Sequence, residues 1–264
     1  MNLGIEGETA LVLGGTQGLG LSCAEALAGA GVRVLVNARS GAGWEAARVH
    51  VPGGVFIQGD IGKPADRDAI CKAADEHAPV SIVVTNAGGP PAGQFEELTS
   101  QQWRDAFETN VLGVLEIVRH FLPAMKARRF GRVINITSFV VKELYPNMSL
   151  SNSMRVGLTG AMGSLARECA AHGVTINGIL PGLMDTGALQ RVVRDRAART
   201  GVAEAQVKRG MAESIPMQRL GTAADFGPMC AFLSSRLAGY VTGQTLYIDG
   251  GRAGLNYTMA PKAS

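Results

Sequence analysis

Short apolar runs recur along the chain and alternate with longer segments of helical character. The runs are rich in β-branched residues and almost continuously apolar, a pattern typical of strands buried on both faces in a parallel sheet. They are Thr9–Leu13, Val32–Val36, Val55–Gln58, Ser81–Thr85, Arg132–Thr137, Val174–Leu180 and Thr245–Ile248. The segments between them predict helices over Gly18–Ala30, Pro64–His77, Ser100–Arg128, Ser149–His172 and Ala223–Leu233.

This alternation continues without a Pro/Ser-rich linker, so we predict one α/β domain over residues 1–264. Its doubly wound, Rossmann-like sheet would have seven mostly parallel strands. Thr99 and Gln102 have the spacing of a capping box, and Gly173 is placed to cap the fourth helix at its C-terminus. Residues 187–212 fit no strand and are predicted to form a helical substrate lid. Residues 252–264 form a C-terminal tail, in which Tyr257 and Met259 could anchor on a neighbour.

Composition excludes several classes of protein. Glycine supplies 35 of the 264 residues, but without a Gly-X-Y period, and the 46% of apolar residues is too high for a disordered chain. No apolar run approaches the ~18 residues of a membrane helix. The start MNLGIEGETALVL has no basic cluster, unlike a secretory signal. We therefore expect a soluble, cytoplasmic protein with no membrane partner.

Charge and cysteine usage suggest no further ligand. The net charge is +3, and much of the basic excess lies in residues 191–209, interrupted by Asp195 and Glu204. A solvated helical face explains this better than nucleic acid binding. The cysteines share no metal-ligand spacing, so we expect no metal and interpret them as buried thiols. They are Cys23, Cys71, Cys169 and Cys230.

The strongest local motif is LVLGGTQGLG at residues 11–20, where an apolar strand runs into glycines and then a helix. Gly14, Gly18 and Gly20 let the backbone N–H groups approach a pyrophosphate at the helix N-terminus. We predict that this loop, with Thr16, Gln17 and Leu19, binds a dinucleotide. A purely structural turn is the alternative, because the spacing is G-x-x-x-G-x-G and glycine is abundant.

The second strand ends in VNARS at residues 36–40. A site specific for NAD would place Asp or Glu here to bind the ribose 2′-hydroxyl. This chain has Ala38, Arg39 and Ser40 instead, and a guanidinium with a hydroxyl suits a 2′-phosphate. The sequence therefore predicts NADP(H), unless Arg39 is only a surface residue.

Several ordered motifs resemble the short-chain dehydrogenase/reductase family over nearly the whole chain. The resemblance implies adenine contacts from Asp60 and Ile61, further cofactor contacts after the fourth and sixth strands, and a catalytic serine and helix asparagine. The matching residues are Gly14, Gly18, Gly20, Asp60-Ile61, Asn86-Ala87-Gly88, Asn110, Ser138, Pro181-Gly182 with Thr186, and Asp249-Gly250-Gly251.

The catalytic Tyr-x-x-x-Lys of this family is absent, because Ser151 and Arg155 stand at its two positions. Arg155 can still bind ribose hydroxyls, whereas the hydroxyl of Ser151 is a poor substitute for a phenol. Tyr145 is a candidate substitute acid and Lys142 a candidate active-site cation. Solvent exposure on a loop is the alternative for both.

Two reactions are compatible with these replacements. One is reduction of a carbonyl group. The other is hydride addition to a conjugated enone, in which Ser138, Arg155 or Lys142 would stabilise the oxyanion. A protein that binds NADPH without catalysis, with a regulatory or sensor role, and a scaffold that has lost both functions are the alternatives.

Partners follow from the resemblance to 3-oxoacyl-carrier-protein reductases and their paralogues. It implies a small-molecule or acyl-thioester substrate and a homotetramer or homodimer. Arg129 and Arg167 correspond to cations that face an acidic carrier protein, although arginine at a helix C-terminus also complements the helix dipole. An apolar substrate pocket is suggested by lid residues that could equally be ordinary packing: Met184, Leu189 and Val192.

Overall fold

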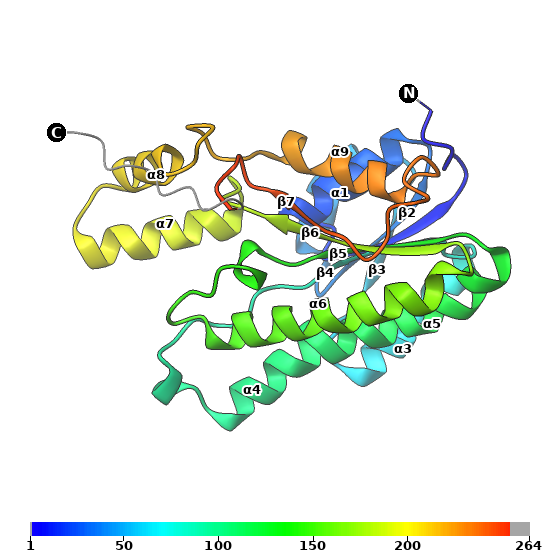
Figure 1. Cartoon of the computed structure of the whole chain (residues 1–264), viewed down its shortest axis with the longest axis horizontal. Helices are drawn as coiled ribbons and strands as arrows, with labels where there is room; N and C mark the ends of the chain where they lie inside the picture. The colour runs from blue at the N-terminus through cyan, green and yellow to red at the C-terminus, as the bar shows by residue number, and fades with distance from the viewer. Residues whose placement is uncertain (1, 254–264) are drawn as a thin grey trace.

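The computed structural model describes residues 2–253 and contains a seven-stranded sheet in which every pairing is parallel (Figure 1). The strand order is β3-β2-β1-β4-β5-β6-β7. The bounds are β1 Thr9–Leu13, β2 Arg33–Ala38, β3 Val55–Gln58, β4 Ile82–Asn86, β5 Gly131–Ile136, β6 Val174–Pro181 and β7 Thr245–Ile248. The predicted fold class is confirmed, and each predicted strand is present with its ends shifted by at most about two residues.

The centre of the sheet is buried on both sides. Every residue of β1 and β5 is buried, as expected for central strands that are covered on both faces. Val12 of β1 lies opposite Val36 of β2 on one side and Val84 of β4 on the other. The strand order reverses between β1 and β4, so a crevice forms at their carboxyl ends, where sheets of this type bind ligands.

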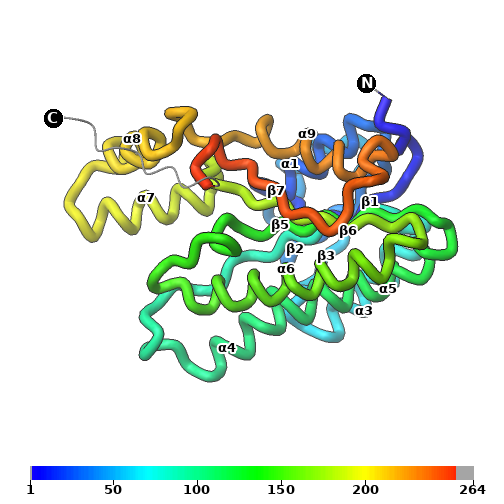
Figure 2. Tube along the Cα trace, viewed as in Figure 1, coloured from blue at the N-terminus to red at the C-terminus, as the bar shows by residue number. Residues whose placement is uncertain are grey.

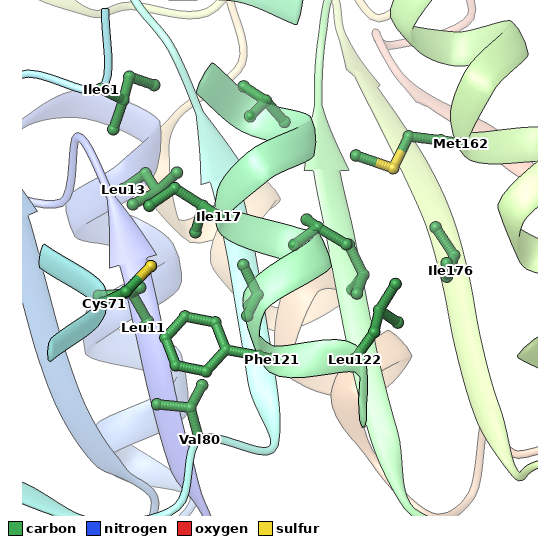
Figure 3. Close-up of a cluster of buried hydrophobic side chains, with 14 of the residues drawn as sticks. Leu11, Leu13, Ile61, Cys71, Val80, Ile117, Phe121, Leu122, Met162 and Ile176 are labelled. Carbon is green, nitrogen blue, oxygen red and sulfur yellow. The ribbon is translucent and has the colours of Figure 1, made fainter. Parts of the chain in front are cut away.

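Helices cover the sheet in two layers. Helices α1 and α9 pack on one face, and α3, α5 and α6 on the other (Figure 1). Their bounds are α1 Gly18–Gly29, α2 Trp44–Ala47, α3 Pro64–His77, α4 Ser100–Phe107, α5 Gly113–Arg128, α6 Ser149–Ala170, α7 Gly187–Thr200, α8 Glu204–Glu213 and α9 Ala223–Ser234. Figure 3 shows Ile117 and Phe121 of α5 packed over Leu11 and Leu13 of β1.

The predicted helix Ser100–Arg128 is not continuous. A π-helical turn, Glu108–Leu112, separates α4 from α5. Gly113 lies so close to the turn between β3 and α3 that a Cβ on Gly113 would clash with the carbonyl oxygen of Ile61. The extra residue of a π-turn changes the direction of the side chains around it, and such turns are frequent at functional sites.

Helices α7 and α8 extend past the carboxyl edge of the sheet as a pair (Figure 2). Gly201 adopts φ = 69° and ends α7. The two helices and the segment after them share an apolar cluster of their own: Leu189, Val193, Val207, Met211, Ile215 and Leu220. The pair occupies the segment for which a helical lid is predicted.

Two helix ends test the local predictions. The capping box of Thr99 and Gln102 is present at the start of α4. Gly173 has φ = 72° but lies beyond the C-cap of α6, which is Ala171, so its predicted role as the cap is wrong. Gly173 has left-handed backbone, and a Cβ there would clash with the carbonyl oxygen of Arg129, so both its conformation and its surroundings require glycine.

All four cysteines are buried and none forms a disulfide, as predicted. Within residues 2–253, no helix is long and apolar enough to cross a membrane. The proposed tail anchors, Tyr257 and Met259, lie outside the described residues.

Candidate functional site

The carboxyl end of β1 continues into a glycine loop that has no space for side chains. Gly14 has φ = 58°, and a Cβ there would lie 2.7 Å from the carbonyl oxygen of Asn86. A Cβ on Gly20 would clash with the carbonyl oxygen of Gly14. Asn86 Nδ2 donates to that oxygen at 3.2 Å and so joins the ends of β1 and β4. These glycines keep the backbone accessible to a ligand.

Helix α1 begins at Gly18 without a side-chain cap, since Gln17 makes no capping hydrogen bond. The first N–H groups of the helix are therefore available to an anion, which the helix dipole favours. Thr186, the N-cap of α7, faces this loop, with its methyl carbon 3.8 Å from the position of a Cβ on Gly18. Thr16 and Leu19 are half-buried within the loop. The arrangement fits the pyrophosphate of a dinucleotide.

Strand β2 ends beside this loop in Ala38, which is followed by exposed Arg39 and Ser40. Asn37 fixes this end, because its Nδ2 donates to the carbonyl oxygen of Ile57 at 3.0 Å. Arg39 makes no ion pair within residues 2–253. Its guanidinium is available to a phosphate group, and no carboxylate stands at these three positions to compete for it.

Asp60 and Ile61 lie in the turn after β3. Asp60 Oδ1 accepts a hydrogen bond from Gly62 N at 3.0 Å, and Asp60 N donates to Asp66 Oδ2 at 2.9 Å. Ile61 is buried against α5 at Gly113. These contacts stabilise the turn beside β2.

The π-turn places Asn110 against the loop after β4. Asn110 is 4% exposed, and its Nδ2 donates to the carbonyl oxygen of Gly88 at 2.7 Å. Asn86 and Ala87 precede this oxygen in the same loop, so the structure brings these predicted residues together at the crevice.

Arg67 of α3 holds the π-turn in place, a role that no sequence motif indicates. Its side chain is 4% exposed, and Nη1 donates to the carbonyl oxygen of Ile61 at 2.9 Å and to Glu108 Oε2 at 3.2 Å. Its Nε also lies 2.6 Å from Glu116 Oε2, outside hydrogen-bond geometry. Glu108 begins the π-turn and Glu116 follows it on α5, so one guanidinium connects both sides of Asn110 to the β3–α3 turn.

Ser151 and Arg155 lie one turn apart on α6 and contact each other, with Arg155 Nε donating to Ser151 Oγ at 3.2 Å. Ser151 is 6% exposed. Arg155 also borders a small cavity with Asn110, Thr137 and other residues at the ends of β4 and β5. Burial lowers the pKa of the Arg155 guanidinium to about 10, so it stays protonated at neutral pH. No carboxylate in the described part of the chain forms an ion pair with it.

The segment between β5 and α6 carries the other candidate catalytic residues. Ser138 is half-buried, and its Oγ accepts from Val140 N at 3.4 Å. Lys142 is exposed. Tyr145 Oη donates to Glu143 Oε2 at 3.3 Å and accepts a hydrogen bond from Arg252 Nη2 at 2.5 Å. Sequence reasoning missed Arg252, because its partner lies 107 positions away and no motif connects the two.

The loop after β6 packs against the end of β7. Gly182 N donates to the carbonyl oxygen of Ile248 at 2.9 Å, and a Cβ on Gly182 would lie 2.6 Å from the Cβ of Asp249. Pro181 is buried at the end of β6, and this turn leads to Thr186 opposite the glycine loop.

The suggested apolar pocket residues pack elsewhere. Leu189 belongs to the apolar cluster shared by α7 and α8. Met184 is buried in the apolar cluster between the sheet and helices α1 and α9. Val192 is 52% exposed. A shallow hollow on α3 and α5 contains none of the predicted site residues. It is lined by Asp68, Cys71, Lys72, Asp75, Glu76 and His120. Among residues 2–253, no group of three or more potential ligands is placed to bind a metal ion.

Comparisons with known proteins agree with this geometry. The family model described as enoyl-(acyl carrier protein) reductase matches residues 14–253. The 3-oxoacyl-[acyl-carrier-protein] reductase FabG of Haemophilus influenzae is 32% identical over 249 residues, covering 94% of this chain and 98% of that protein.

Two solved structures extend the similarity. A variant of the actinorhodin polyketide ketoreductase with NADPH matches with a TM-score of 0.88 and 30% identity, covering 95% of this chain and 98% of that one. YwfH, an NADPH-dependent reductase involved in bacilysin biosynthesis, matches with a TM-score of 0.89 and 25% identity, covering 94% and 99%.

Proposed function

The chain belongs to the short-chain dehydrogenase/reductase family, and from this premise we propose that it is an NADPH-dependent reductase of carbonyl or conjugated enone groups with a non-standard active site. The observation that carries the proposal is the half-buried Arg155, which has no carboxylate partner in the described chain and borders a small cavity with Asn110.

The binding crevice fits NADPH. The glycine loop and the uncapped α1 suit a pyrophosphate, and Arg39 with Ser40 suits the 2′-phosphate. Thr186 closes the opposite side of the loop. When bound, NADPH supplies the hydride. The related ketoreductase with NADPH supports this cofactor.

Replacing Arg39 with alanine is expected to lower the affinity for NADPH by about 10–100-fold, because charge-assisted hydrogen bonds of ~1.5–3 kcal/mol are lost. The affinity for NADH should not change, since NADH has no 2′-phosphate. Fluorescence titration with each cofactor measures both. Arg33→Ala removes the same charge from the opposite end of β2 and serves as the control. An equal loss of both affinities in Arg39→Ala contradicts the assignment.

Arg155 can stabilise negative charge on a substrate oxygen without giving up a proton. After hydride adds to the β-carbon of an enone, the electron pair moves onto the oxygen, where Arg155 and the Ser138 hydroxyl donate hydrogen bonds. Water then protonates the α-carbon, so the saturated ketone forms without a phenol. A ketone instead needs a proton on its oxygen, which Ser151 supplies poorly. The description of the matched family model, which names an enoyl reductase, supports the first route.

Enones are therefore expected to turn over at least about 10-fold faster than ketones, because a positioned general acid is worth ~10²–10⁴ in rate. The test is NADPH consumption with 2-cyclohexenone and with cyclohexanone, and product analysis shows which bond is reduced. Turnover of ketones alone contradicts the enone route. Tight NADPH binding without turnover across a wider panel of enones and ketones would favour the second candidate, a cofactor-binding regulator, for which the replacement of the family's tyrosine by Ser151 is the motivating observation.

A further inference from the structure

Arg252 occupies an aromatic site formed by the segment after β5. Its guanidinium carbon lies 4.6 Å from the ring centre of Phe139 and 5.8 Å from that of Tyr145. The two rings meet edge to face at 5.4 Å. Arg252 Nη2 donates to Tyr145 Oη, so the orientation of the guanidinium plane is fixed.

The turn after β7 directs Arg252 to this site. Asp249 accepts hydrogen bonds from Gly251 N at 2.9 Å and from Ala253 N at 2.6 Å, and Gly250 and Gly251 have φ values of 68° and 86°. The carbonyl oxygen of Gly250 accepts from Met217 N at 3.2 Å. Arg252 therefore lies between the segment after α8 and the β5–α6 segment. In Figure 1, the red segment after β7 lies near the α7–α8 pair.

One nitrogen of this guanidinium has no acceptor. Nη1 is buried and makes no hydrogen bond within the described residues. The carboxylate of Glu143 accepts a hydrogen bond from Tyr145 Oη and forms no ion pair with Arg252. A buried donor without an acceptor costs free energy. A ligand oxygen that displaces the groups covering Nη1 would offset this cost with a new hydrogen bond.

We propose that Arg252 binds a carboxylate of the substrate. The substrates of this protein would then include oxo acids or enone acids, in addition to neutral carbonyl compounds. This inference rests on the proposed reductase function. Phe139 directly follows Ser138, whose Oγ caps the turn that carries the ring. We therefore expect a carboxylate on Arg252 to lie against the segment that carries Ser138.

A monoanionic carboxylate matches the site better than a phosphate. One guanidinium supplies one positive charge, and Glu143 adds a negative charge to the same network. The planar guanidinium also pairs with planar carboxylates through parallel N–H···O bonds. Tyr145 then acts as a positioning residue that holds Arg252, because both its donor and its acceptor are used there.

The test is isothermal titration of the NADPH-bound protein with benzoate, an unreactive carboxylate, and with benzamide, its neutral match. Benzoate should bind the unmodified protein at least about 10-fold more tightly than benzamide. Arg252→Gln should remove that preference. Arg199→Gln, which removes the same charge from an exposed position on α7, should keep it.

Tyr145→Phe provides a second variant that keeps Arg252 and the aromatic ring. It should weaken benzoate binding and leave the affinity for NADPH unchanged. The proposal is overturned if benzoate binds no better than benzamide, or if Arg252→Gln binds benzoate as the unmodified protein does. Failure of the proposed reductase function gives a different result. The unmodified protein would then show no NADPH binding or no turnover, while benzoate would still bind to the cofactor-free protein through Arg252.

Discussion

The double variant Ser151→Tyr/Arg155→Lys is expected to reduce cyclohexanone about 10²–10⁴-fold faster than the natural chain, because it restores the general acid and its cationic neighbour. The two positions lie one turn apart on the same face of α6, and Arg155 already borders the cavity that contains Asn110. Lysine is shorter than arginine and leaves space for the new phenol beside it. Enone turnover should change much less, since its α-carbon takes a proton from water.

The rate constant with saturating cyclohexanone and NADPH measures this gain. Ser153→Tyr puts the same phenol on an exposed position of α6 and should not change the rate. If the double variant binds NADPH normally and shows no faster ketone reduction, the missing phenol does not limit the reaction, and the explanation for the enone preference is wrong.

Replacing Arg67 with methionine is expected to lower the free energy of unfolding by about 3 kcal/mol, at the lower end of the range for breaking a buried ion pair. The lower end applies because the side chains of Glu108 and Glu116 are 39% and 30% exposed and can regain water. The variant also removes the contact with the Ile61 carbonyl oxygen. Urea unfolding measures the difference.

Arg48→Met is the matched control, because Arg48 pairs with Glu45 in an ion pair that is 59% and 73% exposed. Its loss should cost less than about 1 kcal/mol. If both variants unfold at the same urea concentration with the same slope, Arg67 does not hold the π-turn. A loss of turnover that exceeds the loss of NADPH affinity in Arg67→Met would connect this residue to the position of Asn110.

Much of the cofactor side of the site could be predicted from the sequence, because it is made by short segments that directly follow strands. The glycine loop continues β1, and Arg39 follows β2. Once the strands are located, parallel pairing brings these segments to one edge. The resemblance to the family's motifs placed Asn86 and Ser138 near the ends of the fourth and fifth strands, and the structure has Asn86 as the last residue of β4 and Ser138 shortly after β5.

The substrate side was less predictable. Arg252 meets Tyr145 across 107 positions, and Arg67 meets Glu108 across 41. Neither arginine belongs to a periodic pattern or a spaced motif. The interruption of the predicted helix Ser100–Arg128 was also not predicted, and the residue that follows the π-turn, Gly113, packs against Ile61 from a distant segment of the chain.

The sequence by itself determined the doubly wound parallel sheet and the glycine loop, and its resemblance to the family assigns Ser151 and Arg155 to the positions of the catalytic Tyr and Lys. Each depends on residue types in local order, which the strand period and the backbone demands of glycine make readable. Only the tertiary structure decided which cations are buried and what they contact. Burial and pairing of a guanidinium depend on the packing of distant segments, so Arg67 came to hold the π-turn and Arg252 came to lie between Phe139 and Tyr145.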